Sequence, residues 1–222
     1  MAVRQRRIEA DYLKVSDKFE FMGVGFSSID EKPNAQTREV RYVCDASSTQ
    51  SITSYKWQAD FSGDQIESEK VIEYLTAIGK ECKTGADAET EYIKVDMDKK
   101  GTAENSYYAR KFKVAVMISE FPNNDGDLGL SGSFMGLGDP IIGTVTINPD
   151  TKEITFEKGF NEKTLEVEYT ATGDITDISV NGITYDTVNS KFKGIPANIT
   201  SFTFKDDGTE KTATLGSSWT IA

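Results

Sequence analysis

Acidic pairs and one glycine-rich run are the residues of this chain whose types and spacing could support chemistry. Two aspartate pairs, Asp96/Asp98 and Asp125/Asp127, could supply the acid and the base of a glycosidase. Residues 129–140, GLSGSFMGLGDP, have the glycine content of a phosphate-binding loop. The segment NNDGD just before them has the composition of a calcium loop.

The residues around these segments argue against all three chemistries. No Gly-Lys-Ser/Thr sequence is present, and DPIIGTVTI after the glycines predicts another strand where a nucleotide site needs a helix. With Gly126 in the sixth position of a calcium loop, Phe121 falls where the first acidic ligand belongs. Acidic pairs are common on the surface of a chain with 36 Asp and Glu residues. We therefore predict no catalytic site, cofactor or metal.

The glycine-rich segment is better explained as a strand that follows a tight turn. Side-chain alternation separates two faces of this strand. One face carries Leu128, Leu130, Gly132 and Phe134, and the other carries Gly129, Ser131 and Ser133. A face so poor in side chains is typical of a place where another backbone or a passing molecule comes close.

Composition excludes several further classes of protein. The 222 residues include no histidine, and Cys44 and Cys82 are too few for a cysteine-rich zinc site. Because no export signal is predicted, we interpret the two cysteines as buried thiols in preference to a disulfide. The basic N-terminus is not followed by an apolar segment, which predicts no secretory signal, and no apolar run is long enough for membrane insertion. A net charge of −11 is the opposite of what a duplex-binding protein needs.

Period-two alternation predicts that the fold is mainly β. It occurs in residues 19–26, 38–45, 51–61, 91–98 and 109–121. Three of these segments have clear faces: Tyr55, Trp57, Ala59 and Phe61; Ile93, Val95 and Met97 against Lys94, Asp96 and Asp98; and Phe112, Val114, Val116 and Ile118. The spacing of Val71, Ile72, Leu75 and Ile78 instead predicts one helix at about residues 65–79, with Asp64 as its N-cap.

A domain boundary is predicted near residue 159. The segment 143–159 reads as a hairpin, and beyond it the strands become short and rich in Thr, Asp and Asn. An Asn-Gly and an Asp-Gly turn lie in this second part. Residues 160–222 are therefore predicted to form a small accessory β-sandwich of the immunoglobulin-like type, with six or seven strands.

Several separated motifs in residues 5–158 resemble the major tail tube protein of long-tailed, non-contractile phages of Gram-positive bacteria. These are PNAQT-x-E-x-RY, the helix start DQI-x-SEK-x-IEYL and the later GLGDPIIG. The resemblance implies a tail-tube β-sandwich or barrel in residues 1–159, flanked by one helix. It also implies hexameric rings that stack into the tail tube of a virion, a conduit through which DNA passes without sequence-specific binding.

The resemblance further implies particular contacts and partners. An N-terminal arm at residues 1–18 and a loop or hairpin arm at 27–37 would bridge subunits, and residues 160–222 would decorate the tube exterior. The candidates for contact between subunits or rings are Arg4, Arg6, Arg7, Asp30, Glu31, Lys32, Pro33 and Asn34, and those for the lumen are Glu39, Arg41, Asp127, Ser131 and Ser133. Partners would be further copies of the chain, a tape measure protein, a tail terminator and distal tail or baseplate proteins, assembled in the host cytoplasm.

Two alternatives stay open. The chain could be the inner tube protein of a contractile injection system or phage-derived bacteriocin, which shares the fold. It could also be a carbohydrate- or surface-binding β module, although we interpret Trp57 and Trp219 as core residues and not as sugar platforms.

Overall fold

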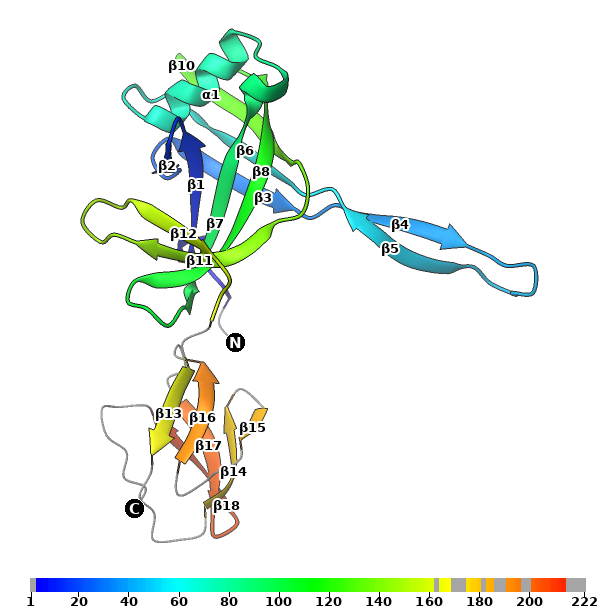
Figure 1. Cartoon of the computed structure of the whole chain (residues 1–222), viewed down its shortest axis with the longest axis vertical. Coiled ribbons are helices and arrows are strands. Elements are labelled where there is room, and N and C mark those ends of the chain that lie inside the picture. The colour runs from blue at the N-terminus through cyan, green and yellow to red at the C-terminus, as the bar shows by residue number, and fades with distance from the viewer. Residues whose placement is uncertain are drawn as a thin grey trace.

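The computed structural model describes residues 3–161, 164–168, 175–180, 183–185, 191–196 and 201–214. In these residues the chain is mainly β, with a single α-helix that lies at one end of a curled antiparallel sheet (Figure 1). No helix in this part of the chain is long and apolar enough to cross a bilayer.

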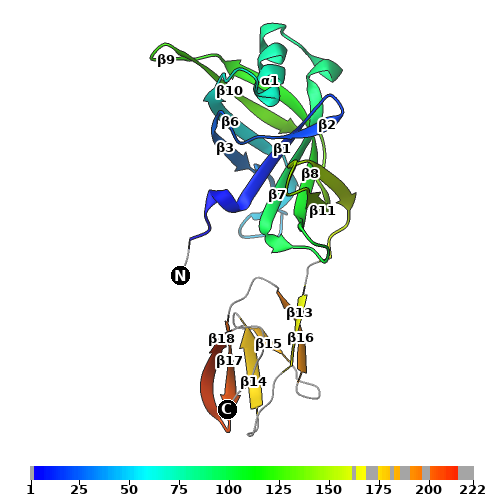
Figure 2. The ribbon, with the colours of Figure 1, turned by 90° about the vertical axis from the view of Figure 1, so that its left-hand side faces the viewer.

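Ten strands form the main sheet. We call this sheet, the helix and the loops that connect them the body. Seven follow the order β2-β1-β7-β8-β10-β6-β3, and β11, β12 and β9 attach to β8, β11 and β10 respectively. Every pairing is antiparallel. The strands are β1 (Glu9–Val15), β2 (Lys18–Phe21), β3 (Phe26–Lys32), β6 (Gln58–Asp64), β7 (Glu89–Lys100), β8 (Ser106–Glu120), β9 (Asn123–Asn124), β10 (Asp127–Gly136), β11 (Ile141–Ile147) and β12 (Ile154–Lys158). The sheet curls into a half-barrel whose terminal strands are β2 and β3 (Figures 1 and 2).

The helix α1 (Lys70–Lys80) covers one end of the half-barrel. It buries the four apolar side chains whose spacing predicted it, Val71, Ile72, Leu75 and Ile78. It begins later than residue 65, however, because Asp64 is the last residue of β6 and Glu69 occupies the N-cap position without a side-chain hydrogen bond. The two short 3₁₀ turns are η1 (Arg6–Ile8) and η2 (Gly85–Ala88).

The half-barrel has an apolar core on each face of its central strands. Under α1, the ring of Trp57 stacks on Phe112 with their centroids 3.8 Å apart, so the prediction that Trp57 is a core residue is confirmed. Phe112, Val114 and Val116 of β8 join the same core. On the opposite face, Ile93 and Val95 pack under the β11–β12 hairpin in a second, smaller core.

A long two-stranded hairpin leaves the body between β3 and β6 (Figure 1). Its strands are β4 (Ala35–Val40) and β5 (Thr49–Tyr55), which pair with each other and with no strand of the main sheet. We call residues 33–56 the arm. The segment 27–37, expected to be a loop or an arm, is divided between β3, which pairs with β6, and the first part of the arm.

The glycine-rich segment is a strand, β10, preceded by the predicted tight turn. Asp125 and Gly126 have φ values of 53° and 108°, as a two-residue turn between β9 and β10 requires. Leu130, Gly132 and Phe134 face the core under α1. A Cβ on Gly132, which lies on this core face, would be 2.2 Å from the carbonyl oxygen of Met117 in the neighbouring strand β8. On the side-chain-poor face, where a close backbone was expected, the atoms nearest to a Cβ on Gly129 belong to the side chains of Pro122 and Asn124.

Further segments differ from the sequence expectation. The strand expected over 38–45 ends at Val40, and the one expected over 51–61 is divided between β5 and β6. Residues 9–15 of the expected N-terminal arm form β1, an inner strand of the sheet that pairs with both β2 and β7. Ala10 and Tyr12 on one face of β1 are buried, and so are Asp11 and Leu13 on the other face. This burial fixes residues 9–15 in the sheet, although the first seven residues are basic. The single strand expected over 19–26 is two strands, because Gly25 has a φ of 85° in the connection between β2 and β3.

The described strands after residue 161 pair only among themselves. They are β13 (Thr164–Glu168), β14 (Ile175–Val180), β15 (Ile183–Tyr185), β16 (Lys191–Pro196), β17 (Ser201–Asp206) and β18 (Thr209–Thr214). Among the described residues, β13 pairs with β16, and the other four form a sheet in the order β15-β14-β17-β18. The Asp-Gly turn is present, with φ values of 46° at Asp207 and 78° at Gly208. Trp219 lies outside the described residues.

Candidate functional site

The arm is exposed along almost its whole length. All seven residues of β5 are exposed, and four of the six residues of β4 are exposed as well. Apolar side chains are among them: Tyr42 retains 68% of its accessible surface, Ile52 59% and Tyr55 61%. A lone two-stranded hairpin is at best marginally stable in water. The arm therefore lacks the apolar cover that normally stabilises such an element.

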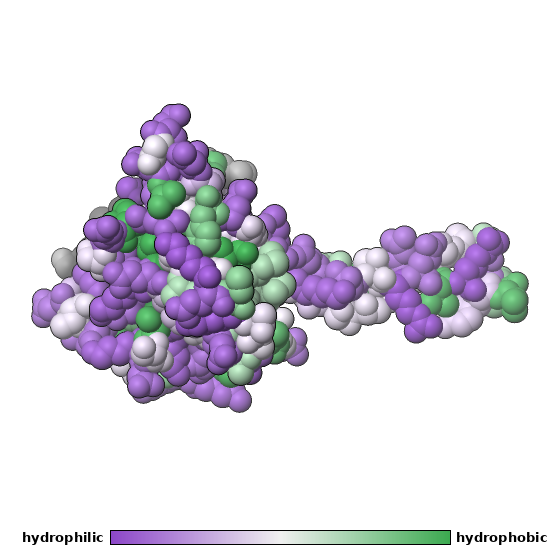
Figure 3. Space-filling model, turned by 90° about the horizontal axis from the view of Figure 1, so that it is seen from above, coloured by the Kyte–Doolittle hydropathy of each residue, from purple (hydrophilic) through white to green (hydrophobic). Residues whose placement is uncertain are grey.

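The far end of the arm carries apolar groups on a defined turn. The backbone N–H of Asp45 donates to the carbonyl of Tyr42 at 3.0 Å, and the Asp45 carboxylate accepts from the N–H of Tyr42 at 3.2 Å. Val43 lies between them and is fully exposed. Figure 3 shows hydrophobic residues at this end of the arm, far from the rest of the body. We call residues 41–45 the arm tip.

A cluster of charged and aromatic side chains holds the base of the arm. Glu31 lies two residues before the arm and Trp57 directly after it. The Glu31 carboxylate accepts a hydrogen bond from the Trp57 indole at 2.6 Å and two from Arg110 of β8, at 2.6 and 2.9 Å. The ammonium of Lys94 in β7 lies 3.6 Å from the same carboxylate. We call Glu31, Trp57, Lys94 and Arg110 the base clamp, since they tie both ends of the arm to the opposite wall of the half-barrel.

The electrostatics of the base clamp favour an ionised Glu31. Burial alone would raise the pKa of Glu31, but the hydrogen bonds from Arg110 and Trp57 and the charges of Arg110 and Lys94 outweigh it and lower that pKa. For Arg110, burial acts in the opposite direction, and the hydrogen bond and charge of Glu31 overcome it, so its pKa is raised. Each partner thus stabilises the charged form of the other.

A second ion pair at the base strengthens this attachment. Lys32, the residue before the arm, forms an ion pair with Asp60 of β6. Hydrogen bonds to Asp60 from Lys32, from the Ser133 hydroxyl and from the Gln58 amide lower the pKa of Asp60 to about 2. The arm is therefore attached through charged contacts on both faces of the β3–β6 pair.

The base clamp continues into a layer of charge inside the half-barrel. Arg6 forms an ion pair with the buried Asp11, which also accepts a hydrogen bond from the Tyr92 hydroxyl. Burial, and then the Asp11 charge, raises the pKa of Tyr92 well above its ordinary value. Lys94 has only 4% of its side chain exposed and lies 2.9 Å from Glu9. These groups fill the interior of the half-barrel beyond the apolar core.

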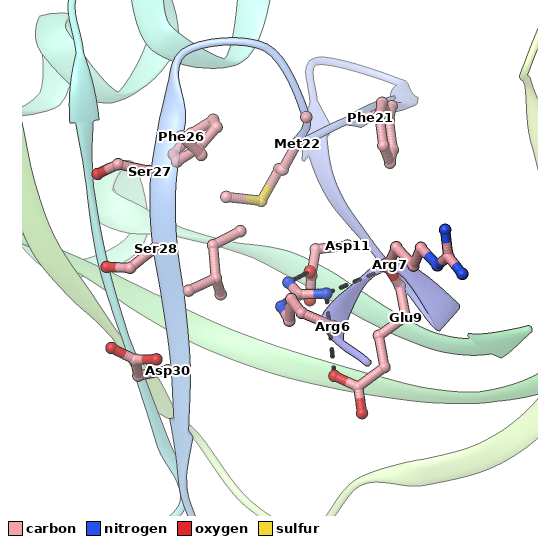
Figure 4. A pocket seen from close by; sticks show the side chains of 12 residues that line it. Arg6, Arg7, Glu9, Asp11, Phe21, Met22, Phe26, Ser27, Ser28 and Asp30 are labelled. Carbon is pink, nitrogen blue, oxygen red and sulfur yellow. Dashed lines mark hydrogen bonds and ion pairs between the residues drawn. The ribbon is translucent and has the colours of Figure 1, made fainter. Parts of the chain in front are cut away.

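The open side of the half-barrel is a pocket between β1 and β3. Its volume is about 420 Å³, and Figure 4 shows Arg6, Glu9 and Asp11 on one wall and Ser27, Ser28 and Asp30 on the other. Dashed lines in that view join Arg6 to the two acidic residues of its own wall. The outer edge of β3 has no strand partner in the described residues.

Polar side chains form rows across the outer face of β3, β6, β10 and β8. The strand registers align Ser28, Ser62, Ser131 and Glu120 in one row, and Asp30, Asp60, Ser133 and Met117 in the next. Hydroxyl contacts join Ser28 to Ser62 at 2.8 Å and Ser131 to Glu120 at 3.4 Å. Lys32, beside these rows, is neutralised by Asp60, and Lys113, further along the same side of β8, by Glu89. This face is thus polar with an excess of negative charge.

The lumen candidates do not lie together. Glu39 and Arg41 are exposed on the arm and do not share a sheet with the other three. Ser131 and Ser133 are on the polar outer face of β10, opposite Leu130 and Phe134 as alternation predicted, and Asp127 is exposed at the start of that strand. Ser133 is 5% exposed because Gln58 and Asp60 cover it, so only Ser131 and Asp127 present accessible polar groups there.

Four of the eight contact candidates form ion pairs within the chain, although three of these four, Arg4, Arg6 and Lys32, are also exposed. Arg4 pairs with Asp98 at 2.8 Å and Arg6 with Asp11, so both are engaged within the chain, as are Glu31 and Lys32 at the arm base. Arg7, Asp30, Pro33 and Asn34 are exposed. Sequence reasoning missed the base clamp, because Lys94 and Arg110 come from strands far from the arm in sequence.

The two cysteines are free and exposed, which contradicts their interpretation as buried thiols. Cys44 lies in the arm tip and Cys82 follows α1. Within the described residues, no group of three or more His, Cys, Asp or Glu side chains could hold a metal ion. Comparison of the chain with protein-family models and with curated proteins gives no match.

Proposed function

We propose that the chain is a structural subunit that polymerises through its arm, as the tail tube protein of a long-tailed phage does. In this proposal hexameric rings stack into a tube that conducts DNA from the virion into the host. The proposal rests on the arm together with the resemblance of residues 5–158 to that family.

The arm is the observation that carries the proposal. It exposes Tyr42, Val43, Ile52 and Tyr55 on a hairpin whose strands pair only with each other among the residues that the structure describes. Fully burying side chains of this size stabilises by about 1.5–3 kcal/mol each. A second subunit would supply that burial, and the base clamp would hold the arm in position to receive it.

The open sheet supports ring formation. The terminal strands β2 and β3 leave edges that no described strand pairs with, and such edges are a liability unless another chain or element covers them. Lateral pairing between subunits would close the half-barrels into a continuous inner barrel. We propose that the polar outer face of β3, β6, β10 and β8 lines the lumen, where its negative charge would repel DNA phosphates and permit passage.

The remaining parts of the proposal concern the strands after residue 161 and the partners of the tube. We propose that these strands belong to a small immunoglobulin-like sandwich that lies on the tube exterior. Tape measure, terminator and distal tail or baseplate proteins would contact the ends of the tube. The subunit would perform no catalysis.

Negative-stain microscopy of the purified chain tests the proposal. We expect rings or tubes of uniform width for the intact chain. A variant in which residues 34–55 are replaced by Asn-Gly retains Trp57 and the base clamp, so it should fold and remain monomeric. A monodisperse monomer of the intact chain at high concentration would instead favour a surface-binding module, and a sheath protein encoded beside this chain would favour a contractile device.

A further inference from the structure

The arm carries the opposite sign of charge from the rest of the chain. It contains three cations, Arg38, Arg41 and Lys56, against the acids Glu39 and Asp45, which gives +1, whereas the whole chain has −11. None of the three cations forms an ion pair within the described residues, and the side chains of all three are exposed. A surface that binds the arm should therefore be acidic and should offer apolar contact for the arm tip.

One groove of the body has this combination. It lies between α1 and the start of β10 and has a volume of about 490 Å³. Apolar groups line it, among them Ile66 and Leu128, which are 38% and 57% exposed. The exposed carboxylates of Glu67 and Glu73 also line it. Figure 3 views the body from the side of α1, where hydrophobic residues lie among hydrophilic ones. We call this the α1 groove.

The segments beside the α1 groove add further uncompensated negative charge. Residues 64–69 contain Asp64, Glu67 and Glu69 and no cation, and residues 123–128 contain two aspartates and no cation. None of these acids forms an ion pair in the part of the chain that the structure describes. Lys80 is the single cation that lines the groove among the described residues, so the groove stays negative.

A polar group in the groove also lacks a partner. The Thr76 hydroxyl oxygen of α1 is buried and has no hydrogen bond, the only such side-chain atom among the described residues. Thr76 lines the groove, and a buried hydroxyl without a partner is unfavourable. An incoming phenol, such as that of Tyr42, or an incoming guanidinium could supply the missing hydrogen bond.

The other large grooves do not match the arm. The groove between β1–β2 and the β11–β12 hairpin, about 630 Å³, is apolar but is lined by Arg7 and Lys152. Its single acid, Glu9, is already engaged by Lys94 at 2.9 Å. In the pocket at the open side of the half-barrel, Arg6 already pairs with the acids Glu9 and Asp11, and Arg7 is a second cation beside them. Neither place therefore offers the set of unpaired carboxylates that lines the α1 groove.

We propose that the α1 groove of one subunit receives the arm tip of a second copy of this chain. Tyr42 and Val43 enter the apolar floor, and Arg38 and Arg41 lie against the acidic rim formed by Glu67 and Glu73. The inference rests on the proposed self-assembly and names its acceptor surface. Donor and acceptor are different surfaces of each copy, so the contact is heterologous and propagates from subunit to subunit.

A pair of charge-reversed variants tests this contact. One has Arg38→Glu and Arg41→Glu in the arm, and the other has Glu67→Lys and Glu73→Lys in the groove. Each variant alone opposes like charges, so its critical concentration for assembly should rise by about tenfold or more at low salt. In an equimolar mixture every arm meets a groove of opposite charge, and assembly should recover.

A matched control replaces the groove variant with Glu104→Lys and Glu157→Lys, which change the net charge equally at exposed sites away from the groove. This control should assemble like the wild type and should not rescue the arm variant. Rescue by the control, or normal assembly of the groove variant, would overturn the inference and leave the proposed self-assembly standing. An intact chain that stays monomeric throughout would refute the proposed function itself.

The native cysteines give an independent measurement. Cys44 lies in the arm tip, and Cys82 follows Glu81 of the groove, so a short bismaleimide should join Cys44 of one copy to Cys82 of another. Mass spectrometry of mixed isotope-labelled chains distinguishes this link from one within a chain. A product dominated by Cys44–Cys44 links would show that arms contact each other and would contradict the assignment.

Discussion

Replacing Glu31 by Gln should loosen the base of the arm. The Glu31 carboxylate holds Arg110 through two hydrogen bonds and Trp57 through a third, and it faces the buried Lys94. Glutamine has nearly the same shape but only one acceptor oxygen and no charge. Its amide N–H groups would point at the N–H groups of Arg110 and Trp57, which are donors themselves. Arg110 and Lys94 would also lose the negative charge of Glu31.

The expected loss of stability follows from the burial of these groups. Breaking a buried ion pair by removing one partner costs about 3–5 kcal/mol. Glu31 is 18% exposed and Arg110 26% exposed, and Lys94 keeps Glu9 as a partner, so the cost should fall to about 2–3 kcal/mol. For a domain of this size that corresponds to a decrease in Tm of roughly 5–10 °C.

The decrease should depend on pH in a predictable direction. The folded-state pKa of Glu31 is lowered, so its carboxylate contributes stability above its unfolded pKa, about 4.3, and that stability is lost as pH falls through the folded value. The difference in free energy of unfolding between wild type and Glu31→Gln should therefore be full at pH 7 and should shrink below about pH 4.

Denaturation and a distance measurement together check the prediction. Urea unfolding gives the stability, and spin labels on Cys44 and Cys82, the two cysteines of the chain, report the direction of the arm. The distance distribution should broaden in Glu31→Gln. Glu153→Gln is the matched control, because Glu153 pairs with Lys18 on the surface and should affect neither quantity. A Glu31→Gln variant with wild-type stability and an unchanged distance distribution would refute the role of the base clamp.

Three further outcomes are expected. Gly132→Ala should destabilise the body by about 2 kcal/mol or more, since the new Cβ would lie 2.2 Å from the Met117 carbonyl oxygen. Urea unfolding measures this loss, with Ser131→Ala as the control variant. Replacing Tyr42 and Val43 by Ser should leave Tm unchanged but abolish tube formation in negative stain, because both side chains are exposed in the monomer. Deleting residues 162–222 should leave tubes intact and thinner. The deletion begins after Phe160 because the ring centroid of Phe160 lies 5.1 Å from that of Tyr108 in the body. Loss of polymerisation in this variant would show that the deleted residues belong to the tube wall.

Local pattern predicted the parts of the fold that depend on neighbours in sequence. The helical spacing of Val71 and Leu75 placed α1 correctly over the core, and alternation assigned Phe112 and Val114 to that core. The Asp-Gly turn before β10 was predictable as well, because few residues tolerate positive φ.

What the sequence could not predict depends on how the sheet curls. Alternation separated Lys94 and Asp96 from their apolar neighbours, and such a face is normally exposed, yet they are 4% and 7% exposed inside the half-barrel. Their partners come from β1, β3 and the N-terminal residues, so no local spacing indicates them. The length of the arm was missed for a related reason, since alternation in 51–61 continues through Tyr55 into Trp57 although only Trp57 is in the body.

The arm is a direct continuation of two paired strands, and this gives it a mechanical property. β3 enters the arm and β6 leaves it, so tension on the tip pulls both strands along their own axes. Seven aligned residue pairs join β6 to β10. A pull along the axis of β6 shears the hydrogen bonds between these two strands, so all of them bear the force at the same time. Hydrogen bonds loaded in parallel share the force, whereas strands peeled apart from one end break them singly. The arm is therefore built to withstand traction.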